Sequence, residues 1–164
     1  MSINENSARD QILKYIKHFP IDFLNQFCGE SWAQPYIDVA AKEASNGYSF
    51  YFLSNFLDKP LAQPYLDKAA KNAAKENSIG FLHNFSDKPW AQPYIGEATK
   101  RIIKEDSIDF LHYFSDKSWA QPYINDAVKE AAKKESILFL EKWADKFPQG
   151  IDTALFALGD KKCL

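Results

Sequence analysis

Hydrophobic residues recur three and four positions apart along this chain, in blocks that repeat every 29 residues. Each block carries a Phe-Leu pair and a second aromatic residue four positions after the Phe, as in Phe81, Leu82 and Phe85. This spacing puts the apolar side chains on one face of a helix, whereas a strand would alternate every second residue. We therefore predict a short helix, called helix B, in five successive blocks, the clearest at residues 107–115. The Phe-Leu pairs begin at Phe23, Phe52, Phe81, Phe110 and Phe139.

A second phrase, Trp-Ala-Gln-Pro-Tyr-Ile, starts at Trp32, Trp90 and Trp119, and a softened copy starts at Leu61. Proline presets the backbone for a first helical turn and disfavours helical geometry in the residue before it. We therefore predict that the Gln is extended and that each Pro begins another helix, called helix A. One column of helix A is always alanine, which indicates a close helix contact, at Ala40, Ala69, Ala98 and Ala127.

Two polar columns mark the expected ends of these helices. A serine precedes the apolar face of most B helices and is predicted to cap it by accepting a hydrogen bond from a free backbone amide, at Ser49, Ser78, Ser107 and Ser136. An aspartate lies in the turns that follow the last four B helices, and it would cap any extra helical turn formed before the Gln-Pro step, at Asp58, Asp87, Asp116 and Asp145.

Repetition at a fixed period predicts that small units stack and bury their hydrophobic faces against one another. A less regular helix is expected at residues 7–17, and one more short helix at residues 150–158. We predict a single repeat domain over residues 1–164. Its parts would be an N-terminal capping pair (1–31), four repeats (32–60, 61–89, 90–118 and 119–147) and a C-terminal cap (148–164).

Paired helices, an aromatic-rich helix B, a helix A opened by proline and short Asp-Lys links resemble the shorter HEAT-like repeats. Tetratricopeptide and ankyrin repeats are longer, and a leucine-rich repeat needs a Leu-x-Leu strand that this chain lacks. The resemblance implies an all-α fold, a right-handed α-solenoid of about five antiparallel helix pairs. HEAT-like proteins mostly bind other proteins; some act as chromophore lyases or their partners, and one branch repairs alkylated DNA.

Composition narrows the function classes only slightly. The 20 basic and 22 acidic residues give a net charge of −2, so no overall field favours nucleic acid or anionic membrane. No apolar run approaches the roughly 18 residues of a membrane span, and the first residues lack a basic, apolar leader. We expect a cytoplasmic monomer without a membrane segment. Cys28 and Cys163 do not make a disulfide framework.

Columns that stay constant between repeats serve the repeat contacts, whereas columns that differ are free for recognition. On the B helices the differing columns form one exposed face with aromatic and adaptable polar residues, which are typical of interfaces. The alternative is a merely solvated face. We expect a non-enzymatic scaffold that binds a protein or peptide through Tyr51, Asn55, His83, Asn84, Asp109, His112 and Tyr113.

A lysine ladder on the A helices supports a different hypothesis, in which regularly spaced positive charges follow a nucleic-acid backbone. The ladder consists of Lys42, Lys71, Lys100 and Lys129. Glutamates interleave with it, and Arg101 stands nearly alone where bidentate phosphate readers would be expected. A third hypothesis is a structural repeat module with no separate ligand.

Catalysis and metal binding have weaker support. His83 and His112 occupy equivalent positions one repeat apart, but no close His or Cys spacing accompanies them. Ser107, Asp109 and His112 contain the residue types of a nucleophile, an acid and a base, yet no nucleophile elbow or oxyanion loop lies near them in the sequence. We therefore expect no enzyme activity, no cofactor and no metal.

Overall fold

The computed structural model describes residues 3–161, and the surroundings of side chains for residues 6–159. Within residues 3–161 the chain is entirely helical and turn, without a β-strand, and contains eleven α-helices. Neighbouring helices pack against each other. The all-α prediction is therefore confirmed, and the right-handed HEAT-like geometry stays a prediction. Cys163 lies outside the described residues.

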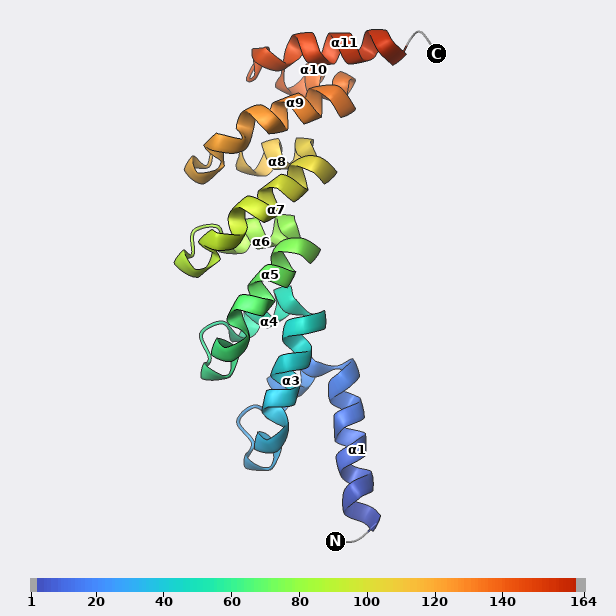
Figure 1. Cartoon of the computed structure of the whole chain (residues 1–164), viewed down its shortest axis with the longest axis vertical. Helices are drawn as coiled ribbons and strands as arrows, with labels where there is room; N and C mark the ends of the chain where they lie inside the picture. The colour runs from blue at the N-terminus through green and yellow to red at the C-terminus, as the bar shows by residue number, and fades with distance from the viewer. Residues whose placement is uncertain (1–2, 162–164) are drawn as a thin grey trace. The chain divides into compact units, whose positions relative to one another are not determined.

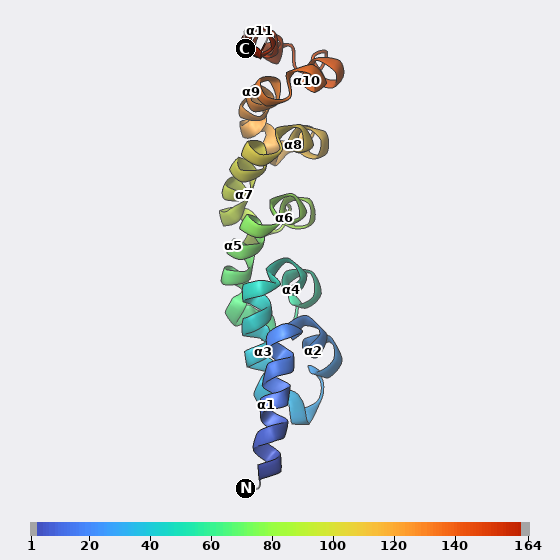
Figure 2. The ribbon, with the colours of Figure 1, turned by 90° about the vertical axis from the view of Figure 1, so that its right-hand side faces the viewer.

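The chain divides into two compact units, the first ending at Asn77 and the second beginning at Ser78. Unit 1 contains the A helices α1, α3 and α5 and the B helices α2 and α4, and these form two layers (Figures 1 and 2). Short 3-10 segments, η1 and η2, connect each B helix to the next A helix. The bounds are α1 Ile3–His18, α2 Pro20–Phe27, η1 Ser31–Ala33, α3 Gln34–Gly47, α4 Ser49–Phe56, η2 Pro60–Tyr65 and α5 Leu66–Glu76.

Unit 2 repeats this arrangement with the B helices α6, α8 and α10 and the A helices α7, α9 and α11. In Figure 2 its B helices are again seen end-on beside the A helices. Its elements are α6 Ser78–Phe85, η3 Pro89–Ala91, α7 Gln92–Glu105, α8 Ser107–Phe114, η4 Ser118–Tyr123, α9 Ile124–Lys134, α10 Ser136–Trp143, η5 Pro148–Gly150 and α11 Ile151–Lys161.

The constant apolar columns form the core of each unit. The Phe of every Phe-Leu pair is almost fully buried, and so is each of the four alanines predicted at a close helix contact. The repeated Trp packs on both Phe residues of the preceding B helix: Trp90 lies 6.1 Å from Phe81 and 5.2 Å from Phe85 between ring centroids. The repeated motif therefore holds an A helix against the B helix before it.

The prediction that the Gln before each Pro is extended is wrong where helix α3 or α7 begins. Gln34 and Gln92 have right-handed helical dihedral angles, and each is the first residue of its helix. Their side-chain amides donate hydrogen bonds to a carbonyl six residues earlier, at the end of the B helix; for Gln92 the acceptor is Ser86, at 3.0 Å. This tie stabilises the turn and explains the constant Gln.

The serine caps are also not formed as predicted at three of the four positions. Ser49 donates its hydroxyl hydrogen to the carbonyl of Ser45, at 2.7 Å, and Ser136 donates to Lys133. In α8 the preceding residue is the cap, because the Asp106 carboxylate accepts a hydrogen bond from the backbone amide of Asp109 at 3.0 Å. All four serines are buried, and the hydroxyls of Ser49 and Ser136 bond back to a carbonyl, whereas the buried Ser107 hydroxyl has no hydrogen-bond partner.

The extra helical turn before the Gln-Pro step does form, as the 3-10 segments. Its cap residue, however, is the lysine that follows the aspartate, at Lys59, Lys88 and Lys117, with no side-chain cap. The aspartates therefore do not occupy the predicted cap position. Asp116 instead accepts a hydrogen bond from Lys146, at 2.8 Å.

The last helix follows a shorter connection than the others. Ile151 begins α11 27 residues after Ile124 begins α9, and the buried Ala154 lies 27 residues after the contact alanine Ala127. Gly150 permits this approach, because a Cβ there would collide with the Phe139 ring, at 2.7 Å from its Cε1 atom, and would lie 2.8 Å from Val128. The 29-residue register therefore ends at α10.

Candidate functional site

The residues predicted to bind a partner lie on the outward side of the B helices. Six of the seven are exposed and Asp109 is half-buried. Tyr51 is 61% exposed and Tyr113 is 47% exposed, so these two aromatic side chains lie at the surface and not in the helical core. The predicted exposure is therefore confirmed, and the binding role stays a prediction.

An open groove of about 560 Å³ lies between the C-terminal ends of α6 and α8, in unit 2. His83 and Asn84 reach it from α6, and Tyr113 reaches it from α8. Trp119 closes one side from η4. The groove therefore brings together three of the predicted residues from two neighbouring repeats.

Some polar groups of this face are already engaged within their own helix. The side-chain amide of Asn84 donates to the carbonyl of Gly80 at 2.8 Å, and that of Asn55 donates to the carbonyl of Tyr51 at 2.7 Å. Each side-chain oxygen is then the atom that faces outward to accept a hydrogen bond. His112 is not part of the groove lining, but its ring packs edge-on against Tyr113 with centroids 4.8 Å apart.

The ion pairing of the lysine beside the α6–α8 groove differs from that of the equivalent lysine beside α8 and α10. There, Lys146 forms an ion pair of 2.8 Å with Asp116 and a hydrogen bond of 2.9 Å with Ser115. Lys117 is the equivalent of Lys146 one repeat earlier, and among residues 6–159 it forms no ion pair. Lys117 lines the groove together with Asp87 and Lys88, which form an ion pair with each other at 3.6 Å. Lys117 is therefore the groove cation without a described ion-pair partner, and it can meet a carboxylate.

A second, smaller groove of about 320 Å³ lies in unit 1, at the start of α2 and α4. Besides the predicted Tyr51, it is lined by Phe19 and Tyr48, which are 52% and 43% exposed. Neither Phe19 nor Tyr48 was predicted from the sequence to bind a partner. Their column is the cap position of helix B, where later repeats have Asn77, Asp106 and Glu135. An aromatic residue where polar caps are favoured was the available signal.

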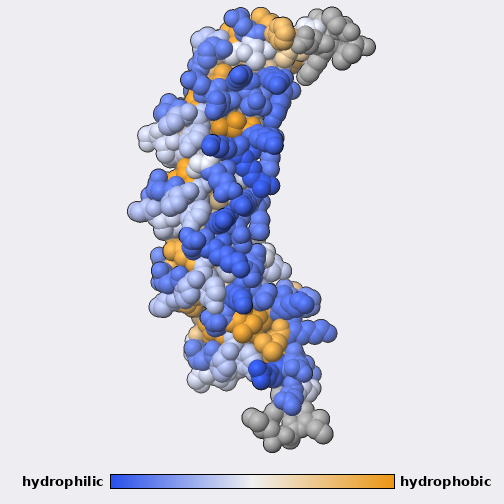
Figure 3. Space-filling model, in the orientation of Figure 1, coloured by the Kyte–Doolittle hydropathy of each residue, from blue (hydrophilic) through white to orange (hydrophobic). Residues whose placement is uncertain are grey.

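The lysine ladder is exposed on the A helices, but it is not a uniform positive surface. Lys100 and Lys129 line a groove of about 510 Å³ between α7 and α9, and Asp126 and Glu130 line it too. Glu130 forms an ion pair with Lys134 at 3.3 Å. Figure 3, which looks onto the A helices, shows mostly hydrophilic surface over α7 and α9. Paired charges of both signs weaken a phosphate-binding surface.

The residues considered for catalysis or metal binding do not come together. Ser107 is 1% exposed and faces the core, whereas His112 is exposed on the same helix. Within the part of the chain that the structure describes, there is no group of three His, Cys, Asp or Glu residues able to hold a metal ion. Cys28 is a half-buried free thiol.

The pKa of Tyr65 is clearly shifted. The Tyr65 hydroxyl donates a hydrogen bond to the Asp38 carboxylate between α3 and η2. This bond, together with burial of the phenol and the negative charge of Asp38, raises the pKa of Tyr65 from 10.0 to about 12. The pair joins α3 to η2 within unit 1, so it stabilises the fold.

No helix in the described part of the chain is long and apolar enough to span a bilayer. Comparison with known proteins gave no matching family model, no matching curated sequence and no matching solved structure.

Proposed function

We propose that the chain is a non-enzymatic scaffold that binds a protein or peptide through the outward face of its B helices. The observation that carries this proposal is the groove between α6 and α8, where His83, Asn84 and Tyr113 meet. The chain would present this face on a right-handed, HEAT-like stack in the cytoplasm, as a monomer. The resemblance of its repeats to that class supports this part of the proposal.

The lining of the groove suits a peptide that carries both an apolar and an acidic side chain. Tyr113 and Trp119 offer aromatic surface, which contributes much of the binding energy at protein interfaces. Lys117 offers a charge without an internal partner, and His83 adds a hydrogen-bonding ring. Because charged contacts at an interface rim act mainly on specificity and on the association rate, we assign the affinity to the aromatic pair.

The proposal is tested with peptides selected from a random displayed library on the folded, full-length chain. Affinity is then measured for the wild type and for His83→Ala and Tyr113→Ala, by fluorescence anisotropy. We expect each substitution to weaken binding, with a loss of about ten-fold or more for Tyr113→Ala, as for an aromatic residue at an interface centre. Both side chains are exposed, so helicity should stay unchanged.

A matched control replaces Lys100 and Lys129 on the opposite helices with Ala. Under the proposal, peptide affinity is unaffected by this change and depends only weakly on salt. Peptides that lose affinity in the lysine variant while keeping it in Tyr113→Ala would show that the A helices are the binding face and that the proposal is wrong.

A further inference from the structure

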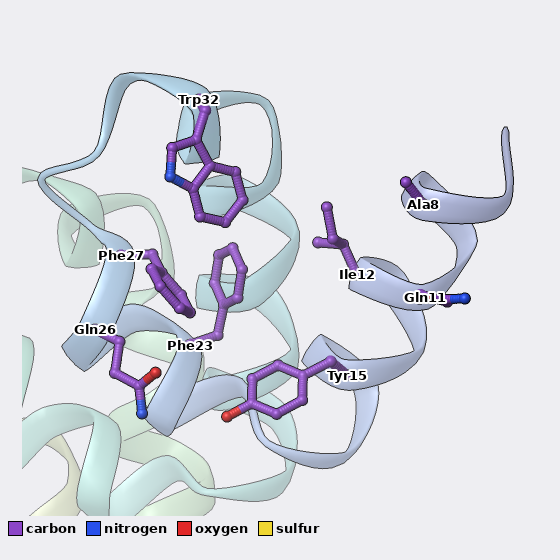
Figure 4. A pocket seen from close by; sticks show the side chains of 8 residues that line it. All are labelled: Ala8, Gln11, Ile12, Tyr15, Phe23, Gln26, Phe27 and Trp32. Atoms are coloured by element: carbon purple, nitrogen blue, oxygen red, sulfur yellow. The ribbon is translucent and has the colours of Figure 1, made fainter. Parts of the chain in front are cut away.

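An apolar hollow of about 520 Å³ lies in unit 1, between α1 and α2. Figure 4 shows Ile12 and Tyr15 of α1 on one side and Phe23, Phe27 and Trp32 on the other. Trp32 packs edge-on against both phenylalanines, with ring centroids 6.2 Å from Phe23 and 5.1 Å from Phe27. We call this hollow the α1–α2 slot.

The repeats themselves show what occupies the equivalent place elsewhere. Gln26, Phe27 and Trp32 of the slot lie three repeats of 29 residues before Tyr113, Phe114 and Trp119, which face α6 across the α6–α8 groove. The helix that would face the slot is therefore the counterpart of α6. Moving α6 back by three repeats gives positions before residue 1, and within residues 3–161 no helix occupies that place.

Burial supports the same correspondence on the α1 side. The slot residues Ala8, Gln11 and Tyr15 are exposed, and Tyr15 is 38% exposed. Their counterparts three repeats later, in helix α7, are Ile95, Ala98 and Ile102, which are 5%, 0% and 6% exposed. Helix α7 packs against the B helices on both of its sides, α6 and α8. Among the described helices, α1 packs against one B helix, α2, which is the counterpart of α8, and against the A helix α3.

The outer face of a terminal repeat is expected to be polar, because one side of it meets water. The α1–α2 slot departs from this expectation. Trp32 is 48% exposed, and Phe27 is half-buried, although its counterpart Phe114 is 2% exposed. A solvated cap does not need two aromatic side chains at its surface.

We propose that the α1–α2 slot binds an amphipathic helix of another polypeptide, one that carries the B-helix pattern of Phe-Leu followed by an aromatic residue. The bound helix continues the repeat contacts by one element, in the manner of α6 against α7 and α8. Recognition is then of the helix-in-groove kind, with apolar anchors spaced one helical turn apart. Because this surface is separate from the α6–α8 groove, either site can exist without the other.

The test uses a peptide with the sequence of residues 78–91, which includes helix α6 and the turn that follows it. A covalent link in place of the first backbone hydrogen bond of the peptide holds it in a helix without using any side chain. Circular dichroism verifies that the free peptide is helical before it is used. Binding to the full-length chain is followed by the indole N–H resonance of Trp32, assigned with Trp32→Phe. We expect a saturable shift at peptide concentrations below about 1 mM.

Two variants identify the slot, and a third serves as the control. Trp32→Ala and Tyr15→Glu should each weaken binding about ten-fold or more, since they remove an aromatic anchor or add a charge there. Both side chains are partly exposed, and circular dichroism confirms that the variants fold. Tyr113→Ala should leave the peptide affinity unchanged.

Absence of binding by the preformed helix at about 1 mM, or binding that survives both slot substitutions, would overturn this inference. Binding that is lost in Tyr113→Ala but kept in Trp32→Ala would overturn it as well, because the peptide would then occupy the α6–α8 groove. That last result would leave the proposed function standing, so the two proposals fail separately.

Discussion

At the scale of single residues, the constant positions of the repeat each have an identifiable contact. The Gln of the repeated phrase donates a hydrogen bond to the end of the B helix before it, and the Trp covers the phenylalanines of that helix. Six of the seven variable B-helix residues predicted to bind a partner are exposed, whereas variable columns of the A helices, such as Thr99 and Val128, are buried. Variation between repeats therefore indicates a recognition surface only where the variable residue is also exposed.

The Gln contact gives a prediction about stability. In Gln121 the side-chain amide donates to the carbonyl of Ser115 at 2.9 Å, in a part-buried position. We expect Gln121→Ala to lower the free energy of unfolding by about 1 kcal/mol, the usual value of one such bond. Urea denaturation followed by circular dichroism measures it. The exposed Gln149, outside the phrase, provides the control; an equal loss in Gln149→Ala would contradict the assigned role.

Tyr65 gives a prediction about alkaline pH. Its pKa of about 12 in the folded chain exceeds the ordinary 10.0, so the folded state favours the neutral phenol. The resulting stabilisation is complete below pH 10 and is lost as the pH rises toward 12. The free energy of unfolding of wild type minus that of Tyr65→Phe should therefore be constant below pH 10 and fall above it. A pH-independent difference would show that the Asp38 contact does not form.

At the scale of helices, hydrophobic spacing and proline positions were enough to predict both helix types and the contact alanines. They were insufficient at helix ends, where competing hydrogen bonds decide the geometry. Ser49 bonds back to a carbonyl where a cap was predicted, and Gln92 is helical because its side chain ties the turn. Tyr51 was predicted from its variable column on helix B. Phe19 and Tyr48 lie one residue before α2 and α4, outside the helical face from which the exposed residues were predicted.

The connection to α11 gives a prediction at this scale. A Cβ on Gly150 would lie 2.7 Å from the Cε1 atom of the buried Phe139 ring, closer than side chains pack. Since Phe139 is fully buried, it has little room to move. We expect Gly150→Ala to lower the free energy of unfolding by about 1–3 kcal/mol, as other overpacked cores do. Gly29, with open space around its Cα, is the matched control, and Gly29→Ala should not reproduce this loss.

At the scale of the whole molecule, each unit combines a repeated set of helix contacts with exposed surfaces that these contacts do not need. The α6–α8 groove lies between two neighbouring B helices. The α1–α2 slot lies beside the B helix α2, on the side where a preceding B helix would pack. The sequence could indicate which face of the B helices is exposed, but it could not reveal the groove. The groove and the unpaired charge of Lys117 both depend on how the side chains are placed in the folded chain. It equally could not reveal that Trp32 stays uncovered when its counterparts are half-buried.

The central claim is that the variable residues of the B helices carry recognition and the constant residues carry the fold. The most direct test is the dissociation constant of a peptide selected on the full-length chain, measured for wild type, Tyr113→Ala and Gln121→Ala under conditions where all three are folded. We predict a loss of about ten-fold or more in Tyr113→Ala and little change in Gln121→Ala. Unchanged affinity in Tyr113→Ala, with a loss in Gln121→Ala, would contradict the claim.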